Sequence, residues 1–216
     1  MSDQLSLFDE RSAAWPEGFR YQPAVLTPQE EHALVGELPR LPFKEFEFHG
    51  FLGKRRVVSF GWRYDFGQAK LLQAEPMPDF LAPVRASAAR FAGLAPADLS
   101  HVLVTEYRPG AAIGWHKDRR DFGDVIGISL VSPGLFRLRK KAGKSWQRAS
   151  LTLEPRSAYL LRGAARSEWE HSIPPVESLR YSITFRSLQA ERRDPLGQDG
   201  AEAGAGRAGS HRQAVG

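Results

Sequence analysis

The seven residues from Arg180 to Arg186 constrain the fold more than any other part of the chain. Arg, Ser, Thr and Arg occupy every second position, and Tyr, Ile and Phe occupy the positions between them. Successive side chains of a strand point to opposite faces of its sheet, so this alternation predicts one polar and one apolar face. If the polar face is buried, its two guanidinium groups need partners. The alternative is that both arginines lie on the exterior of a barrel, with the apolar face inward.

A histidine and a carboxylate upstream of this strand predict a metal site. His116 and Asp118 lie two residues apart, which places both side chains on the same side of a strand or strand end. His171 can join them only if the chain folds back, as antiparallel strands do. Two His and one carboxylate form the facial triad of non-heme Fe(II) oxygenases, which leaves coordination positions open. Taken singly, His116 and Asp118 are equally compatible with an ordinary turn and an exposed loop.

The two arginines of the alternating strand predict the co-substrate of that metal. Guanidinium groups bind carboxylates through paired hydrogen bonds, so one dicarboxylate would serve both Arg180 and Arg186. The dicarboxylate that iron oxygenases use is 2-oxoglutarate. The predicted chemistry therefore needs Fe(II), 2-oxoglutarate and O2.

These residues lie in a stretch that resembles the AlkB-type Fe(II)/2-oxoglutarate-dependent dioxygenases. The matching motifs are Thr105-Glu106-Tyr107-Arg108-Pro109-Gly110, His116-Lys117-Asp118, Ser129-Leu130, Arg166, His171 and the segment from Arg180 to Arg186. They span residues 100–188, nearly half of the chain. The RxxxTFR ending is more specific to this family than the HxD motif is.

The resemblance implies a role for each matched residue. It implies three Fe(II) ligands that form the catalytic centre: His116, Asp118 and His171. Arg180 would pair with the distal carboxylate of 2-oxoglutarate, helped by Tyr107, and Arg186 would hold the carboxylate beside the keto group. Thr105 and Ser182 complete the predicted cofactor site, although the family commonly has Asn where this chain has Thr105.

A separate set of residues is predicted to contact the substrate. Residues 53–64 are similar to the AlkB segment that forms a lid over a flipped base, with Trp62 and Tyr64 as stacking candidates; both could instead be core or surface aromatics. The family often has an acidic residue two positions after the metal-binding Asp, where this chain has Arg120. Arg166 is a further candidate. The basic stretch at 137–148 suits phosphate contacts, but an ordinary solvated hairpin has the same composition.

Composition and charge limit the class of protein. The 216 residues favour one domain, and 42% hydrophobic residues can supply its core. The absence of cysteine excludes a disulfide framework and a thiolate metal site. Without an 18-residue apolar run or a signal-peptide pattern, we expect a cytoplasmic monomer with no membrane partner. The net charge of +5 favours a polyanionic partner.

The predicted fold is mainly β with flanking helices (α+β): a double-stranded β-helix, or jelly roll, with a helical layer on one sheet. Thr27, Pro28 and Glu30 predict a helix start, and a second helix is expected between Pro78 and Gly93. The two helices would cover the apolar face of the alternating strand. We expect a flexible arm at 1–20, a dioxygenase domain at 21–189 and a disordered tail at 190–216. Within the domain, the lid falls at 43–66 and the jelly-roll core at 100–188.

The N-terminal arm contains a separate motif. Its sequence Gln4-Leu5-Ser6-Leu7-Phe8 resembles the peptide by which bacterial replication and repair proteins dock on the DNA sliding clamp. Gln4, Leu5, Leu7 and Phe8 are the predicted clamp-binding residues. The alternative is an arm that folds back onto its own domain.

The predicted function is oxidative demethylation of N-alkylated nucleobases in DNA, in the repair of alkylation damage. Its macromolecular partner is nucleic acid, with DNA favoured. The same oxygenase chemistry on RNA or on a protein is one alternative. A catalytically silent clamp-binding or nucleic-acid-binding module is the other.

Overall fold

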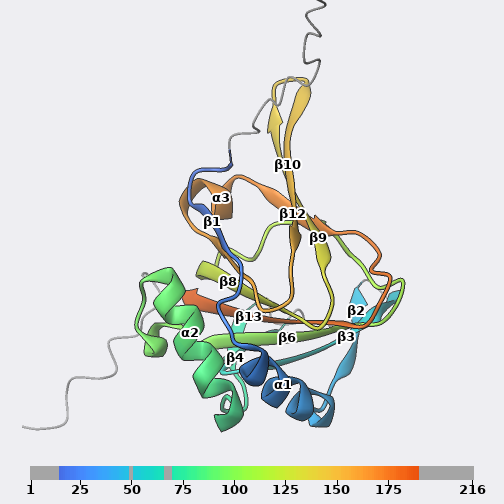
Figure 1. The fold of residues 1–216 in the computed structure, drawn as a ribbon. Coiled ribbons are helices and arrows are strands. Elements are labelled where there is room, and N and C mark those ends of the chain that lie inside the picture. The colour runs from blue at the N-terminus through green and yellow to red at the C-terminus, as the bar shows by residue number, and fades with distance from the viewer. Residues whose placement is uncertain (1–14, 49–50, 66–69, 190–216) are drawn as a thin grey trace, which may run out of the picture.

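Two antiparallel sheets form the framework of the chain, as the sequence predicted (Figure 1). The computed structural model describes residues 15–48, 51–65 and 70–189. The larger sheet has the order β1 (Phe19–Gln22), β11 (Ala158–Leu161), β8 (Phe122–Leu130), β13 (Arg180–Leu188), β6 (His101–Tyr107), β3 (Phe51–Phe60) and β2 (Lys44–Phe48). The smaller sheet has the order β10 (Ser145–Leu153), β9 (Gly134–Ala142), β12 (Glu170–Ile173) and β7 (Ile113–His116). A further pair is formed by β4 (Trp62–Asp65) and β5 (Lys70–Gln73).

Local sequence sets the ends of the two longer helices. At the start of α1 (Pro28–Glu37), the Thr27 hydroxyl accepts from the Glu30 amide at 3.2 Å, and the Glu30 carboxylate accepts from the Thr27 amide at 2.7 Å. The second helix, α2 (Ala82–Ala92), ends at Gly93, whose φ of 69° lies in the left-handed region that favours glycine. The shorter helices are η1 (Leu38–Arg40), η2 (Asp79–Leu81), η3 (Pro96–Asp98) and α3 (Gly163–Ser167). Among the described residues, no helix is long and apolar enough to cross a membrane.

The helices α1 and α2 cover one face of the larger sheet, at the bottom of Figure 1. Tyr181, Ile183 and Phe185 of β13 are buried in the same core as Leu34 of α1 and Val84 of α2. The predicted cover for the apolar side of the alternating strand is therefore confirmed. Because the apolar residues point to the helices, the polar residues of β13 must point to the other side.

That other side faces the smaller sheet. β13 is paired with β6 on one side and β8 on the other, so its polar residues lie in the middle of the larger sheet. Apolar side chains from both sheets pack between them, including Val125 of β8 and Phe136 of β9. Arg180, Ser182 and Arg186 consequently face an interior space instead of solvent.

The folded domain begins earlier than residue 21, where the sequence placed its start. β1 pairs with β11 along its whole length, from Phe19 opposite Leu161 to Gln22 opposite Ala158. The predicted arm therefore ends before residue 19. A four-residue edge strand carries too little alternation to be recognised, and its partner strand lies far along the chain.

The covered face of β13 yields a stability prediction. Replacing Ile183 with alanine should lower the free energy of unfolding by about 2–5 kcal/mol, because the side chain is fully buried and its loss leaves a cavity. Denaturant unfolding followed by circular dichroism measures this change. Leu135→Ala is the control: Leu135 is 43% exposed, so its replacement should lower the free energy of unfolding much less. Equal losses in the two variants would show that the helices do not bury this face.

Candidate active site

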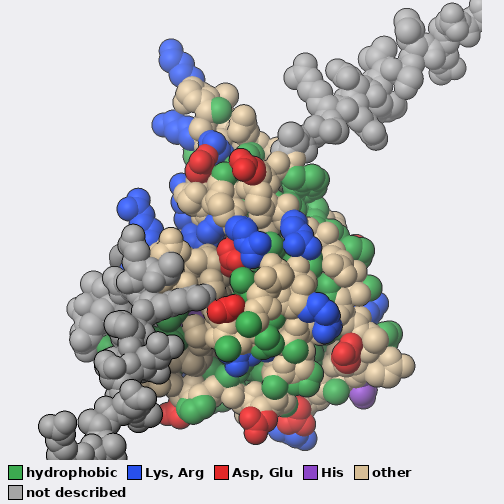
Figure 2. Space-filling view, turned by 90° about the vertical axis from the view of Figure 1, so that its left-hand side faces the viewer, with side chains coloured by type: hydrophobic (Ala, Val, Ile, Leu, Met, Phe, Trp, Pro, Cys, Tyr) green, Lys and Arg blue, Asp and Glu red, His purple; other side chains and the backbone are tan. Residues whose placement is uncertain are grey.

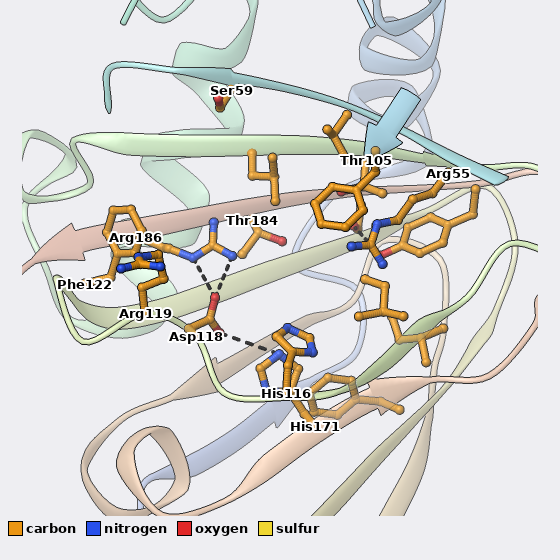
Figure 3. Close-up of a pocket in the computed structure, with 18 of the residues that line it drawn as sticks. Arg55, Ser59, Thr105, His116, Asp118, Arg119, Phe122, His171, Thr184 and Arg186 are labelled. Carbon is orange, nitrogen blue, oxygen red and sulfur yellow. Dashed lines mark hydrogen bonds and ion pairs between the residues drawn. The ribbon is translucent and has the colours of Figure 1, made fainter. Parts of the chain in front are cut away.

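A cavity of about 430 Å³ lies between the two sheets and gathers their polar side chains (Figure 3). The eight residues predicted for the metal and for 2-oxoglutarate all line it: His116, Asp118, His171, Thr105, Tyr107, Arg180, Ser182 and Arg186. They come from both sheets and from the loop after β7. The fold therefore brings together residues that are up to 81 positions apart in the sequence, from Thr105 to Arg186.

Strand pairing places the two histidines side by side. His116 is the last residue of β7 and stands opposite His171 of β12, with ring centroids 4.2 Å apart. The Nδ1 atom of His116 lies 2.9 Å from the carbonyl oxygen of Gly114. A carbonyl oxygen only accepts, so Nδ1 must donate this hydrogen bond. In the neutral ring this hydrogen bond places the proton on Nδ1 and the lone pair on Nε2, the atom that would bind a metal.

Asp118 presents one carboxylate oxygen to the protein and the other to the cavity. Its side chain is 5% exposed, and its Oδ1 accepts two hydrogen bonds from Arg186, from Nε at 2.9 Å and from the terminal nitrogen at 2.7 Å. Its Oδ2 is buried without a hydrogen-bond partner and lies 3.6 Å from Nε2 of His171. A buried, unpaired carboxylate oxygen is costly, so this atom is suited to a cation.

The surrounding charges fix the protonation of these groups. Burial alone would raise the pKa of the Asp118 carboxyl, but the positive charge of Arg186, helped by that of Arg166, holds the pKa well below its usual value. Burial lowers the pKa of His171 to about 3, against the opposing effect of the Asp118 charge. At neutral pH the site therefore offers a neutral imidazole and an ionised carboxylate, the forms in which both groups bind metals.

Two imidazole nitrogens and one carboxylate oxygen fit Fe(II). Among the described residues, His, Asp and Glu side chains form no closed group of three at metal-binding separation. The three predicted ligands are neighbours in Figure 3, with Oδ2 of Asp118 3.6 Å from Nε2 of His171. His116 and His171 are held by strand pairing and Asp118 by Arg186.

Arg180 supplies a second site, for an anion. Its side chain is 1% exposed, and one terminal nitrogen donates to the Ser129 hydroxyl at 3.1 Å. Its Nε and its other terminal nitrogen have no hydrogen-bond partner. The guanidinium lies 4.8 Å from the ring centre of Tyr107, whose hydroxyl is 3.3 Å from that of Ser182. A buried cation with two free donors fits a carboxylate, as 2-oxoglutarate would provide.

Arg186 has different contacts from those that the sequence predicted. It was expected to bind the carboxylate beside the keto group, but its Nε and one terminal nitrogen are already bonded to Asp118. The remaining terminal nitrogen donates to Nδ1 of His101 at 3.3 Å. In this structure Arg186 therefore orients Asp118, a predicted metal ligand, and any contact with the co-substrate is additional to that role.

His101 is a cavity residue that the sequence analysis missed. It is 5% exposed, and burial together with the charge of Arg186 lowers the pKa of His101 well below its ordinary value. The ring is therefore neutral and can accept from Arg186. Tyr107, Thr105 and Leu103 alternate back along β6 to His101, so extending that alternation would have found it.

Arg166 was predicted to contact the substrate, but the structure uses it to hold the loop after β7. Its guanidinium donates to the carbonyl oxygens of Asp118 at 3.0 Å, Phe122 at 3.1 Å and Gly123 at 3.1 Å, and also to that of Arg119. Asp118 and Arg119 lie on the loop after β7, whereas Phe122 and Gly123 begin β8, so Arg166 fixes the loop that carries a predicted metal ligand to the strand that follows it. These bonds give Arg166 a positioning role that only the three-dimensional path of the loop could reveal, and its contact with the substrate stays a prediction.

Two of the other predicted substrate residues, Trp62 and Arg120, do not line the cavity. Trp62 lies on β4 and is half-buried outside it, and the side chain of Tyr64 is outside the described residues. Arg120 is exposed on the loop after β7, whereas its neighbour Arg119 lines the cavity. The predicted clamp-binding residues Gln4, Leu5, Leu7 and Phe8 also lie outside the described residues.

Comparison with known proteins identifies relatives of this site and fold. The sequence model of the 2OG-Fe(II) oxygenase superfamily matches residues 18–186. The Alkylated DNA repair protein ALKBH8 homolog of Arabidopsis thaliana is 29% identical over 162 residues, which cover 63% of this chain and 47% of that protein. The Alpha-ketoglutarate-dependent dioxygenase alkB homolog 7, mitochondrial, of Bos taurus is 31% identical over 188 residues, which cover 82% of this chain and 73% of that protein.

Solved structures share the fold at low sequence identity. OsALKBH1 superposes with a TM-score of 0.64 at 15% identity and covers 80% of this chain and 97% of its own. A Pseudomonas putida prolyl-4-hydroxylase gives a TM-score of 0.55 at 16% identity, with coverages of 80% and 93%. The predicted jelly roll and the predicted family resemblance are confirmed. The chain spans about half the length of the Arabidopsis relative.

The carboxylate of the triad yields a metal-binding prediction. Asp118→Asn should abolish Fe(II) binding, because it removes the ligand charge and leaves Arg186 uncompensated beside the ion. Metal titration of the purified protein measures this. Asp124→Asn is the control, since Asp124 is also paired with an arginine, Arg162, but lies outside the cavity. Undiminished Fe(II) binding by Asp118→Asn would remove Asp118 from the ligand set.

The hydrogen bonds from Arg166 to the loop after β7 yield a second prediction. Arg166→Met should weaken Fe(II) binding by about 10- to 100-fold, because residues that hold a ligand in place affect metal affinity to that extent. Arg166→Lys should recover only part of the affinity, since an ammonium group cannot match the guanidinium's planar set of donors. Arg40→Met removes an exposed arginine on η1 and should change nothing. Wild-type metal affinity in Arg166→Met would contradict the positioning role.

Proposed function

The chain belongs to the 2OG-Fe(II) oxygenase superfamily and to its AlkB-type members, and on that premise we propose that it removes N-linked alkyl groups from nucleobases in DNA. The predicted enzyme class and cofactors, Fe(II), 2-oxoglutarate and O2, are those of the superfamily. The substrate is the part of the proposal that needs its own argument.

The observation that carries the chemistry is the meeting of two sites in one cavity. A His/Asp/His set and a buried arginine with two free donors line the same space of about 430 Å³. Fe(II) with 2-oxoglutarate and O2 supplies the oxidising power for hydroxylation of an N-alkyl carbon, after which the alkyl group leaves as an aldehyde. Both sites are intact, which argues against a catalytically silent binding module.

The chain's own residues bind, orient and shield the reactants. Asp118 is kept ionised by Arg186, and His171 is kept neutral by burial, so neither must change its proton before a metal binds. Arg180 and Tyr107 would hold the co-substrate at a fixed distance from the triad. The apolar walls, which include Phe122 and Phe136, keep water away from the site.

A flat wall at the cavity supports a nucleobase as substrate. The Arg55 guanidinium lies 3.8 Å from the ring centre of Phe46, and its terminal nitrogen donates to the carbonyl oxygen of Ala112 at 3.1 Å. Burial lowers the pKa of Arg55, and both members of the stack line the cavity. Stacking against such planar groups is how enzymes hold an extruded base. The name of the Arabidopsis relative, Alkylated DNA repair protein, points to the same substrate.

RNA or a protein side chain is the second candidate substrate. The relatives from cattle and mouse are named only as dioxygenases, without a nucleic acid. Arg119 borders the cavity and Arg120 follows it, where AlkB-type proteins often carry an acidic residue near the base. This change of charge affects which base, or which class of substrate, the cavity accepts.

A substrate panel tests the proposal. Purified protein with Fe(II) and 2-oxoglutarate is incubated with DNA and RNA oligonucleotides that carry single N-methylated bases, and formaldehyde and succinate are measured. We expect formaldehyde from methylated DNA, with one succinate for each formaldehyde. Succinate formation that no oligonucleotide stimulates, but a protein extract does, would defeat the nucleobase proposal.

Arg180 yields a prediction for the co-substrate. Arg180→Met should raise the 2-oxoglutarate concentration needed for turnover strongly, since loss of a buried charge-assisted partner costs about 2–5 kcal/mol. Succinate formation as a function of 2-oxoglutarate concentration measures it. Arg162→Met is the control, because Arg162 pairs with Asp124 outside the cavity. A wild-type requirement in Arg180→Met would show that Arg180 is structural.

A further inference from the structure

The outer face of the smaller sheet is basic along its central strand. In β9, the buried Phe136 and Leu138 alternate with Arg137, Arg139 and Lys141. Phe136 lines the cavity, so the three cations point away from it. They lie on the opposite side of the sheet from the metal-binding residues and play no part in the chemistry proposed above.

The neighbouring strand adds like charge instead of compensating it. Arg148 of β10 stands directly opposite Arg139, a pairing of like charges that destabilises a sheet. Residues 134–153 contain no Asp or Glu. Within the described part of the chain, Glu170 pairs with Arg139 at 2.6 Å and Glu168 pairs with Lys140. Arg137, Lys141 and Arg148 form no ion pair with either carboxylate. The face therefore keeps a net positive charge, which favours binding of a polyanion.

Two tryptophans lie among these cations. The Arg139 guanidinium is 4.3 Å from the ring centre of Trp115 and 4.3 Å from that of Trp146, and Arg137 is 5.0 Å from Trp115. These contacts order both indole rings on the face of the sheet. Trp146 is nevertheless 36% exposed, which is unusual for so large an apolar ring. An ordered, exposed ring beside free cations is suited to stacking with a flat, anionic ligand.

The position of this face connects it to the cavity. The hairpin of β9 and β10 projects from the body of the protein in Figure 1, and Figure 2 shows Lys and Arg side chains gathered on that projection. At its other end the face includes Trp115, the residue immediately before His116. A chain bound along this face would thus run toward the strand that carries a metal ligand.

We propose that the hairpin face, made of Trp115, Arg137, Arg139, Lys141, Trp146 and Arg148, binds a single strand of nucleic acid outside the cavity. The three cations without a carboxylate partner contact phosphates, and Trp146 stacks on a base. This inference rests on the nucleic-acid substrate proposed above and adds where the strand is held. Anionic lipids and acidic peptides carry negative charge, but unlike nucleic acid they do not have an aromatic base on every repeating unit. They therefore fit the two tryptophans less well.

Charge removal on the hairpin tests the phosphate contacts. Fluorescence anisotropy of a short labelled single-stranded oligonucleotide without alkylated bases gives Kd at several salt concentrations for the full chain. Lys141→Gln with Arg148→Gln should weaken binding at least fivefold and lower the salt slope by about 1.4, at roughly 0.7 for each lost contact. Arg40→Gln with Arg90→Gln removes two exposed charges from the helical side and should leave both quantities close to wild type.

Removal of the exposed ring tests the stacking contact. Trp146→Ala should weaken binding about fivefold or more, with an unchanged salt slope, because stacking does not depend on counterion release. Trp15→Ala is the matched control, since Trp15 is 47% exposed but lies outside the hairpin. Circular dichroism of each variant shows whether the sheet is intact.

The outcomes separate this inference from the proposed function. Hairpin-dependent binding without oxidation of any methylated oligonucleotide supports the face and defeats the nucleobase chemistry. If a methylated oligonucleotide is oxidised but both hairpin variants keep the wild-type Kd and salt slope, the hairpin face is not a binding site. The proposed dealkylation would then still hold. Equal weakening by the control variants also overturns the hairpin face as a binding site. A third result would also overturn it: hairpin variants that lose binding to phosphatidylglycerol vesicles but bind the oligonucleotide as the wild type does.

Discussion

The ion pair between Arg186 and Asp118 joins the two sheets at the point where the metal would bind. Arg186 stands in the middle of the larger sheet, and Asp118 follows the edge strand of the smaller one. Their side chains are 10% and 5% exposed, so neither charge could be kept in this interior without the other. The pair keeps the carboxylate ionised and turns its free oxygen toward His171. The geometry of the triad therefore depends on a contact between sheets.

One strand serves both the stability and the chemistry of the protein. Between residues 180 and 186 of β13, the odd-numbered residues lie in the core that the strand shares with α1 and α2, and the even-numbered residues line the cavity. Burial of the apolar face fixes the register of β13, because a slip of one residue would turn every side chain to the other side. Packing of the apolar residues of β13 in the core therefore also fixes the positions of Arg180 and Arg186 on the opposite face of the strand.

Three arginines of the site show how the partner decides the role of a side chain. Arg186 donates to the carboxylate of Asp118, a predicted metal ligand, while Arg166 donates to four backbone carbonyls and holds a loop. Arg180 has a single hydroxyl partner, from Ser129, and keeps two free donors for a ligand. The guanidinium group thus has a positioning role in Arg186 and Arg166, whereas in Arg180 it is available to bind a ligand.

The sequence by itself determined the alternating strand, the start of α1, the end of α2 at Gly93 and the residue types of the triad, because these depend on neighbours close along the chain. It also predicted that His116, Asp118 and His171 act with Arg180, and all four line one cavity. Only the tertiary structure decided what each arginine contacts, since those partners lie on other strands and loops. The basic stretch on β9 and β10 was visible in the sequence as charge alone. Strand register placed its cations on one face with two tryptophans, because cross-strand pairing is a property of the folded sheet.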